Sequence, residues 1–191
     1  AQERRGVLGK ILKSRFAILT AVATAAVAIL AASPLVVEKA PRAGTAGALG
    51  FYRLGGEFTD LKSFQGRPVL LSIWATWCLS CREELPALAR LNREWKEPSL
   101  RVVALSVDRD GAEVVESLLR NLGIVDLPVF LDPAGRAVKE FSVSGLPTSI
   151  LLDRNGREIG RWFGPRSWDA TATRQEIIGL IAKGGNEGQK P

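Results

Sequence analysis

The hydrophobic pattern divides the chain near residue 50. Residues 16–37 carry no charged side chain, and a helix of about 20 apolar residues crosses a bilayer. A cleaved signal peptide is the alternative, although its apolar core usually has only ~7–15 residues. The basic residues that precede the run are Arg4, Arg5, Lys10, Lys13 and Arg15. We therefore expect a cytoplasmic segment at 1–15 and a transmembrane helix at 16–37, and either interpretation exports the rest of the chain.

After residue 50, apolar runs alternate with segments of helical periodicity. Residues 38–50 are rich in Ala, Gly and Pro and predict a flexible linker. We expect strands at 68–74, 101–107, 128–131, 148–152 and, beyond an Asn-Gly turn, 158–163, with helices at 79–95, 112–122, 137–141 and 168–182. This order favours one α/β domain over 51–183, in which a mixed sheet has helices on both faces. The polar residues 184–191 are expected to form a disordered tail.

Composition narrows the possible functions. Most of the formal charge of +6 lies in residues 1–48, where seven Lys and Arg face two Glu. The remaining chain is close to neutral, so we expect no nucleic-acid binding, which needs a basic surface on the folded domain. The chain has no His, which excludes Ser-His and Cys-His catalysis and most zinc and copper sites. We expect no bound metal.

The two cysteines form a CxxC pair at the junction of a strand and a helix. Cys78 would lie at the helix N-terminus, where free N–H groups and the helix dipole stabilise a thiolate. Cys81, three residues on, shares that side of the helix and could close a disulfide. Half of a zinc site and a purely structural disulfide are the alternatives, but no second CxxC or His completes a zinc site. The pattern favours a redox-active pair.

The segment around this pair resembles a known superfamily. Residues 74–86 read WATWCLSCREELP, similar to the thioredoxin superfamily and, within it, to the membrane-anchored bacterial branch that includes TlpA, ResA and CcmG. The resemblance extends from about 51 to 182 and includes GLPT at 145–148, DRNG at 153–156 and GPRSW at 164–168, the last most similar to TlpA. It implies a thioredoxin-like fold and dithiol–disulfide exchange, with no cofactor beyond the Cys78–Cys81 disulfide.

The resemblance also implies roles for residues beside the cysteines. In the superfamily the proline matching Pro147 is cis and lies next to the cysteine pair. Such a bond would turn the Leu146 backbone toward a client, which could pair there as an added strand, with Thr148 beginning the strand behind it. Trp77, next to Cys78, is expected to form an apolar rim that clients touch.

Glu84 is the expected proton carrier. It follows Cys81 by three residues and so shares its side of the helix, whereas the alternative for a helical Glu is a solvated face, as we expect for Arg82 and Glu83. Many thioredoxins carry a buried Asp six residues before the first Cys, and this chain has Ser72 there. The branch places a Glu at the position of Glu84, which implies that it replaces the missing acid.

We expect the protein to reduce disulfides of exported cysteine-containing clients, with its domain in the periplasm and its anchor in the inner membrane. The branch implies clients in cytochrome c or oxidase copper-site maturation and a membrane electron donor. Leu79-Ser80 departs from the X-Pro dipeptides common between such cysteines, and an N–H at Ser80 could make the pair more oxidising. A disulfide-donating oxidase and a metal- or client-binding module without turnover are therefore the alternatives.

Overall fold

The structure, a computed structural model, describes residues 49–95 and 100–187. The chain divides into two units, Ala1–Pro41 and Arg42–Pro191. All of the first unit lies outside the described residues, and so do the predicted segments 1–15 and 16–37, most of the predicted linker and the last four residues. No helix within the described ranges combines the length and hydropathy needed to span a bilayer.

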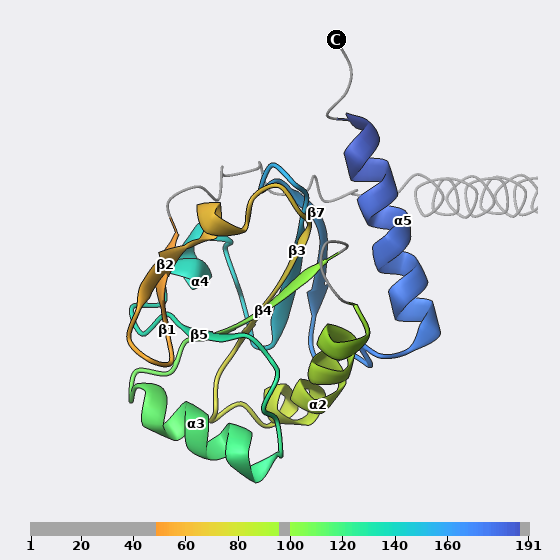
Figure 1. The fold of residues 1–191 in the computed structure, drawn as a ribbon. Coiled ribbons are helices and arrows are strands. Elements are labelled where there is room, and N and C mark those ends of the chain that lie inside the picture. Colours follow the sequence, from red (N-terminus) through yellow and green to blue (C-terminus); the bar gives the residue numbers. More distant parts are fainter. Residues whose placement is uncertain (1–48, 96–99, 188–191) are drawn as a thin grey trace, which may run out of the picture. The chain divides into compact units, whose positions relative to one another are not determined.

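A seven-stranded mixed sheet forms the centre of the domain (Figure 1). Its order is β2-β1-β5-β4-β3-β6-β7, with β3, β4 and β5 parallel and the other neighbours antiparallel. The strands are β1 Gly50–Arg53, β2 Phe58–Asp60, β3 Val69–Trp74, β4 Arg101–Ser106, β5 Val129–Leu131, β6 Thr148–Leu152 and β7 Glu158–Phe163. The predicted mixed sheet is therefore confirmed.

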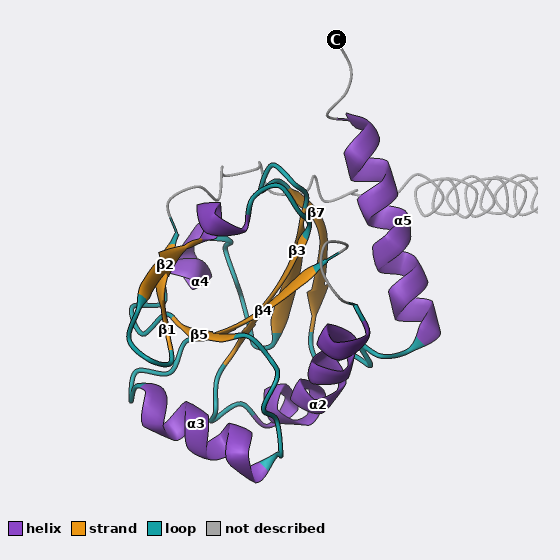
Figure 2. Ribbon diagram, viewed as in Figure 1, coloured by secondary structure: helices purple, strands orange, loops and turns teal. Residues whose placement is uncertain are grey.

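Helices cover both faces of the sheet, as predicted (Figure 2). They are η2 Leu61–Phe64, α2 Leu79–Glu94, α3 Ala112–Asn121, α4 Arg136–Glu140 and α5 Thr171–Glu187. Alternate residues of β3 supply the two cores: Leu70 and Trp74 pack with α2, α3 and α5, while Leu71 and Ile73 pack with η2 and α4. Because β3 is buried on both faces, it reads as a continuous apolar run interrupted only by Ser72.

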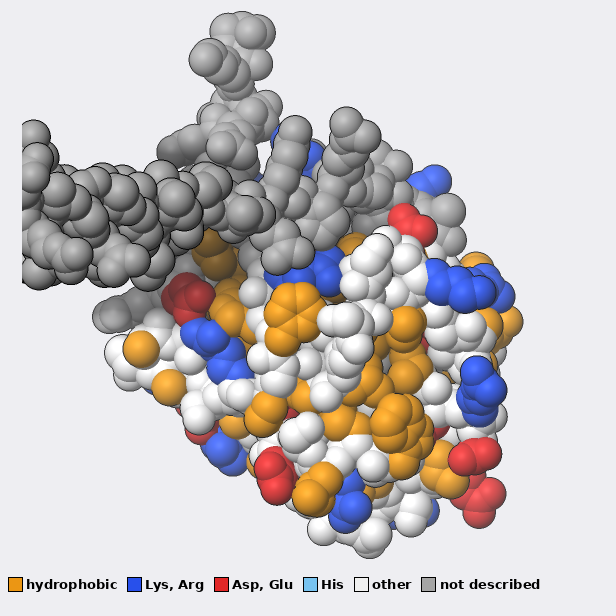
Figure 3. All heavy atoms as spheres, turned by 180° about the vertical axis from the view of Figure 1, so that it is seen from behind, with side chains coloured by type: hydrophobic (Ala, Val, Ile, Leu, Met, Phe, Trp, Pro, Cys, Tyr) orange, Lys and Arg blue, Asp and Glu red, His pale blue; other side chains and the backbone are white. Residues whose placement is uncertain are grey.

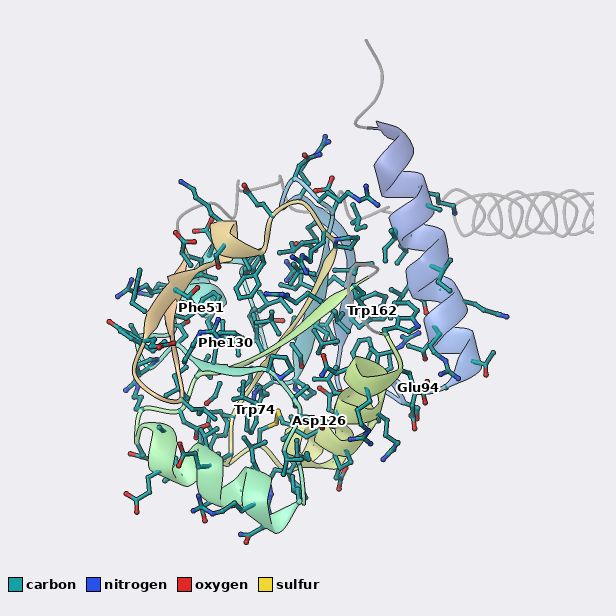
Figure 4. The ribbon with its side chains drawn as sticks, in the orientation of Figure 1. Phe51, Trp74, Glu94, Asp126, Phe130 and Trp162 are labelled. Carbon is teal, nitrogen blue, oxygen red and sulfur yellow. A yellow bond between two sulfur atoms is a disulfide. The ribbon has the colours of Figure 1, made fainter. Side chains whose placement is uncertain are left out.

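The first hairpin was not predicted. Strands β1 and β2 have four and three residues, and most of their side chains are exposed or half-buried, so they lack a clear hydrophobic pattern. Phe51 joins them to the domain, because its ring lies 5.9 Å from that of Phe64 and 5.2 Å from that of Phe130. Figure 4 shows Phe51 and Phe130 side by side between β1 and β5. This contact joins residues far apart in the sequence, which local periodicity does not reveal.

The last helix differs from the prediction at both ends. We expected 168–182 and a disordered tail from 184, but α5 runs from Thr171 to Glu187, so the first residues of that tail are helical. Glycines allow the close packing: a Cβ on Gly184 would lie 3.0 Å from Ile159 Cγ2, and one on Gly160 would lie 2.9 Å from Leu180 Cδ1. Packing against β7 thus outweighs the low helix propensity of glycine near residue 184.

Candidate active site

The cysteine pair lies at the junction between the end of β3 and the start of α2. Cys78 is the N-cap of α2, and its Sγ is bonded to that of Cys81 at 2.09 Å. The Cys81 N–H donates to Cys78 Sγ at 3.2 Å, and Ser80 Oγ lies 3.5 Å from the same sulfur. A thiolate on Cys78 would therefore meet donors already directed at it, at the positive end of the helix dipole.

A buried aspartate holds the loop that leads to Cys78. Asp108 is only 1% exposed, and its carboxylate accepts from Thr76 N at 2.9 Å, Thr76 Oγ1 at 2.6 Å and Ser106 Oγ at 2.7 Å. These bonds tie residues 75–77 to the end of β4, the strand parallel to β3. These hydrogen bonds hold the loop together with the packing of Ala75 in the hydrophobic core.

The outer rim of the site, Trp77 and Leu79, is exposed. These two residues are 71% and 67% accessible, whereas Cys78 is 8% and Cys81 0% accessible. The placement of Trp77 agrees with its predicted position beside the nucleophile. Of the two sulfur-bearing residues, only Cys78 keeps some accessibility, so an incoming disulfide meets it first.

Trp77 also borders a groove of about 530 Å³. Its lining comes from three segments: Trp77, Val107 to Asp110 and the stretch from Pro133 to Lys139 that enters and forms α4. Arg109 and Lys139 are exposed, and within the described residues neither forms an ion pair. On the face seen in Figure 3, hydrophobic side chains reach the surface among both basic and acidic groups. The groove is therefore lined by apolar side chains together with two basic residues and the acidic Asp110, and Trp77 links it to the neighbouring Cys78.

The Leu146–Pro147 peptide bond is cis, which confirms the predicted isomer. Thr148 pairs with Ile73 of β3 and Phe163 of β7, so Leu146 and Pro147 lie at the end of the sheet where β3 leads to Cys78. The Pro147 carbonyl accepts from Gly164 N at 2.9 Å, and Thr148 Oγ1 donates to Gly145 O at 2.6 Å. Within the described ranges no hydrogen bond engages the Leu146 backbone.

Glu84 points into the domain. It is 4% exposed, while Arg82 and Glu83 are exposed, so the alternative of a solvated Glu84 is wrong. Its Oε2 accepts from Arg166 N at 3.0 Å and Trp168 Nε1 at 3.2 Å, and Ser72 Oγ donates to Oε1 at 3.4 Å. We call Ser72, Glu84, Trp168 and the Arg166 amide the inner pocket.

Burial raises the pKa of Glu84 from its usual 4.5 to about 7, although the bonds from Trp168, Arg166 and Ser72 favour the carboxylate. Because both donors to Oε2 are N–H groups that cannot accept, the proton of neutral Glu84 resides on Oε1, facing Ser72. Glu84 can thus take up and release a proton near neutral pH, a property that a general acid–base requires.

Comparison with known proteins shows the family to which this chain belongs. Residues 38–157 match the AhpC/TSA family. The chain belongs to this family. Among its relatives, thiol-disulfide oxidoreductase ResA of Bacillus thuringiensis subsp. konkukian (strain 97-27) is 34% identical over 106 residues, which are 56% of this chain and 60% of that protein. ResA of Bacillus cereus (strain ZK) is 30% identical over 131 residues, 68% of this chain and 70% of that one.

Solved structures that are similar to this chain include proteins with the same kind of described activity as these relatives. A protein described as a thiol:disulfide interchange protein, DsbE, from Chlorobium tepidum superposes with a TM-score of 0.64 at 27% identity, covering 75% of this chain and 99% of the other. The predicted thioredoxin-like fold is confirmed. The names of these proteins and the geometry of the CxxC pair support dithiol–disulfide exchange, and the greater similarity to TlpA stays a prediction.

The sequence analysis did not identify three residues of this site. Asp108 had one available signal, an acidic residue directly after a buried parallel strand, where such strands place polar groups at one sheet edge. Arg166 and Trp168 belong to the GPRSW stretch, which the resemblance marked without assigning a role. Their contact with Glu84 spans 82 and 84 residues, so no local pattern reveals it.

Proposed function

We propose that this protein is a thiol–disulfide oxidoreductase that reduces disulfides of exported cysteine-containing proteins. The observation that carries the proposal is the inner pocket: a carboxyl group with a pKa of about 7 lies three residues beyond the buried cysteine of a CxxC pair. A structural disulfide has no need of a nearby buried proton carrier, whereas a pair that cycles between dithiol and disulfide does.

The reaction runs in two exchange steps. The thiolate of reduced Cys78 attacks a client disulfide, so that a mixed disulfide forms and one client thiolate leaves. Glu84, as the carboxylate, takes the proton of the Cys81 thiol, and the Cys81 thiolate attacks Cys78 Sγ. The second client sulfur then leaves, and the two electrons that reduce the client come from the Cys78 and Cys81 dithiol, which is oxidised to the Cys78–Cys81 disulfide. A membrane electron donor would reduce that disulfide again, and no other cofactor is needed.

The surroundings of Cys78 indicate how a client is held. An extended client segment would pair with the Leu146 backbone ahead of Pro147 and Thr148, and rest an apolar side chain against Trp77 at the mouth of the groove. The names of the relatives, thiol-disulfide oxidoreductase ResA and thiol:disulfide interchange protein DsbE, support disulfide exchange, and the resemblance to the TlpA branch supports clients of cytochrome c or oxidase copper-site maturation. The apolar run at 16–37 would anchor the protein in the inner membrane with this domain in the periplasm.

Trapping tests this function. Cys81→Ser should stop the reaction at the mixed disulfide and accumulate adducts with exported cysteine proteins that dithiothreitol releases, while Cys78→Ser should trap nothing. Equal trapping by both variants would contradict the assigned roles. No trapping by either variant, together with no exchange with glutathione, would favour the binding-module alternative.

A second candidate is a disulfide donor, favoured by Ser80 Oγ at 3.5 Å from Cys78 Sγ. A hydroxyl donating to the thiolate stabilises the reduced pair and makes the protein more oxidising. The reduction potential distinguishes the two: about −270 mV, as in thioredoxin, supports the reductant, and about −120 mV supports the donor. Ser80→Ala should make the potential more negative.

A further inference from the structure

The turn at residues 164–168 supplies both N–H donors to Glu84 Oε2. At one end Gly164 has a positive φ of 78° and donates its N–H to Pro147 O at 2.9 Å, and at the other Ala170 N donates to Ser167 O at 3.2 Å. Neither bond directs the Arg166 amide inward. Burial of the Trp168 ring in the hydrophobic core constrains its indole, and the contacts of the Arg166 side chain add a constraint on the Arg166 amide.

The Arg166 side chain leads from this turn to α5. Its guanidinium pairs with Glu176 Oε2, while Glu176 Oε1 accepts from Trp162 Nε1 at 3.0 Å. The guanidinium carbon lies 5.3 Å from the Trp162 ring centroid and 6.0 Å from that of Trp168, and the two rings meet edge to face at 5.5 Å. Figure 4 shows Trp162 between β7 and α5. One carboxylate of α5 thus holds β7 and the turn together.

We propose that Glu176 and Arg166 are positioning residues for Glu84. Their ion pair, braced by Trp162 and Trp168, holds the turn so that the Arg166 amide and the Trp168 indole point at Glu84 Oε2. An exposed residue of α5 thereby sets how readily the buried carboxyl group ionises. The inference deepens the proposed function, since it rests on Glu84 as its proton carrier, but its test requires no exchange reaction.

The sign of the effect separates positioning from simple charge. Besides Glu84, the charged residues with described side chains on the elements around it are Arg82, Glu83, Arg90, Arg93 and Glu94 of α2, Glu158 and Arg161 of β7, Arg166 and Asp169 in the segment after β7, and Arg174, Glu176 and Lys183 of α5. Removing the negative charge of Glu176 would, through space alone, favour ionisation of Glu84 and lower its titration midpoint. Releasing the turn would remove N–H donors from the carboxylate and raise that midpoint.

The experiment is a pH titration of the oxidised protein from pH 5 to 9. The chain has no His, and disulfide-bonded cysteines do not titrate, so a transition near pH 7 that Glu84→Gln abolishes belongs to Glu84. Fluorescence follows it, because Trp168 donates to that carboxyl group, and the infrared band of the protonated carboxyl provides a second signal.

Glu176→Ala should raise the midpoint of the Glu84 titration by about one pH unit. The free energy of a hydrogen bond to a charged group corresponds to a pKa shift of about that size. Glu176→Gln, which keeps an acceptor for Trp162, should raise it less.

Glu94→Ala is the matched control, because Glu94 also pairs α2 with α5, through Arg174, without a bond to the turn. It should leave the midpoint unchanged even if it lowers stability. A downward shift in the Glu176 variants, no shift, an equal shift in Glu94→Ala, or a wild type without a transition that depends on Glu84 would each overturn the proposal. A raised midpoint in a protein that exchanges no disulfides would support the positioning and refute the proposed function.

Discussion

The outer rim and the inner pocket belong to the same cysteine site but have opposite environments. Trp77 and Leu79 are 71% and 67% exposed, whereas Glu84 is 4% and Cys81 0% exposed. Attack on a client needs an accessible sulfur, while proton transfer at neutral pH needs a carboxyl group whose pKa burial has raised. A single helix N-terminus meets both needs because Cys78 caps it and Glu84 faces inward from its second turn.

The largest expected effect comes from removing the ionisable group of the inner pocket. Glu84→Gln should slow reduction of a model disulfide roughly 100-fold or more, the contribution usual for general acid–base catalysis. It should also remove the rise of the rate near pH 7, which stopped-flow measurements across pH would detect. Glu83→Gln, an exposed neighbour on the same helix, is the control and should leave the profile unchanged.

An added carboxylate sharpens this test. Ser72 Oγ lies 3.4 Å from Glu84 Oε1, so Ser72→Asp places an acid on the other wall of the inner pocket. In the Glu84→Gln background it should restore part of the lost rate. If the double variant is as slow as Glu84→Gln, proton transfer needs the position of Glu84 itself and not merely a buried carboxyl group.

Burial of Glu84 also predicts how stability depends on pH. Above its unfolded value of about 4.5 the unfolded chain loses this proton, while the folded protein keeps it up to about pH 7. The folded state therefore binds more protons in this window, and stability falls as the pH rises through it. Glu84→Gln removes this loss: urea unfolding of the oxidised proteins should show a variant more stable than wild type by about 3 kcal/mol at pH 8 and about equal at pH 4. Parallel curves would contradict the raised pKa.

Substitution of Asp108, which holds the loop under the outer rim, should slow disulfide exchange less than substitution of Glu84. Asp108→Asn places an amide N–H₂ against groups that donate to Asp108, so one buried donor loses its partner. We expect a loss of about 1–3 kcal/mol in urea unfolding and a smaller loss of exchange rate than in Glu84→Gln. Asp110→Asn, at an exposed position two residues beyond Asp108 in the segment after β4, should change neither stability nor the exchange rate with a small model disulfide. A slower reaction at unchanged stability would instead give Asp108 a direct part in exchange.

The smallest effect is expected at the outer rim itself. Trp77→Ala should change stability by less than about 0.5 kcal/mol, because the side chain is mostly exposed. It should raise KM for a protein client about five-fold at unchanged kcat, which corresponds to about 1 kcal/mol of lost contact. Val125→Ala, a 95% exposed apolar residue on another loop, should leave KM unchanged. Equal behaviour of the two variants would argue against a client contact at Trp77.

The local sequence pattern was sufficient to predict much of this site. The spacing of Cys78, Cys81 and Glu84 places all three near one side of α2, and the apolar runs located β3, β4 and β6 to within a residue. The cis bond at Pro147 came from the resemblance to a superfamily rather than from local signals. Strands β1 and β2 were not predicted from the sequence, because their stability depends on a phenylalanine cluster assembled from distant segments.

Helix periodicity determines that Glu84 faces the interior, because positions three apart share a side of a helix. What meets it there depends on the folded chain. Ser72 arrives from β3, and the Arg166 amide and Trp168 indole arrive from a turn more than 80 residues away. Desolvation is a property of the whole packed environment, so a sequence can mark the residue that carries the proton while only the assembled domain sets the pH at which it does so.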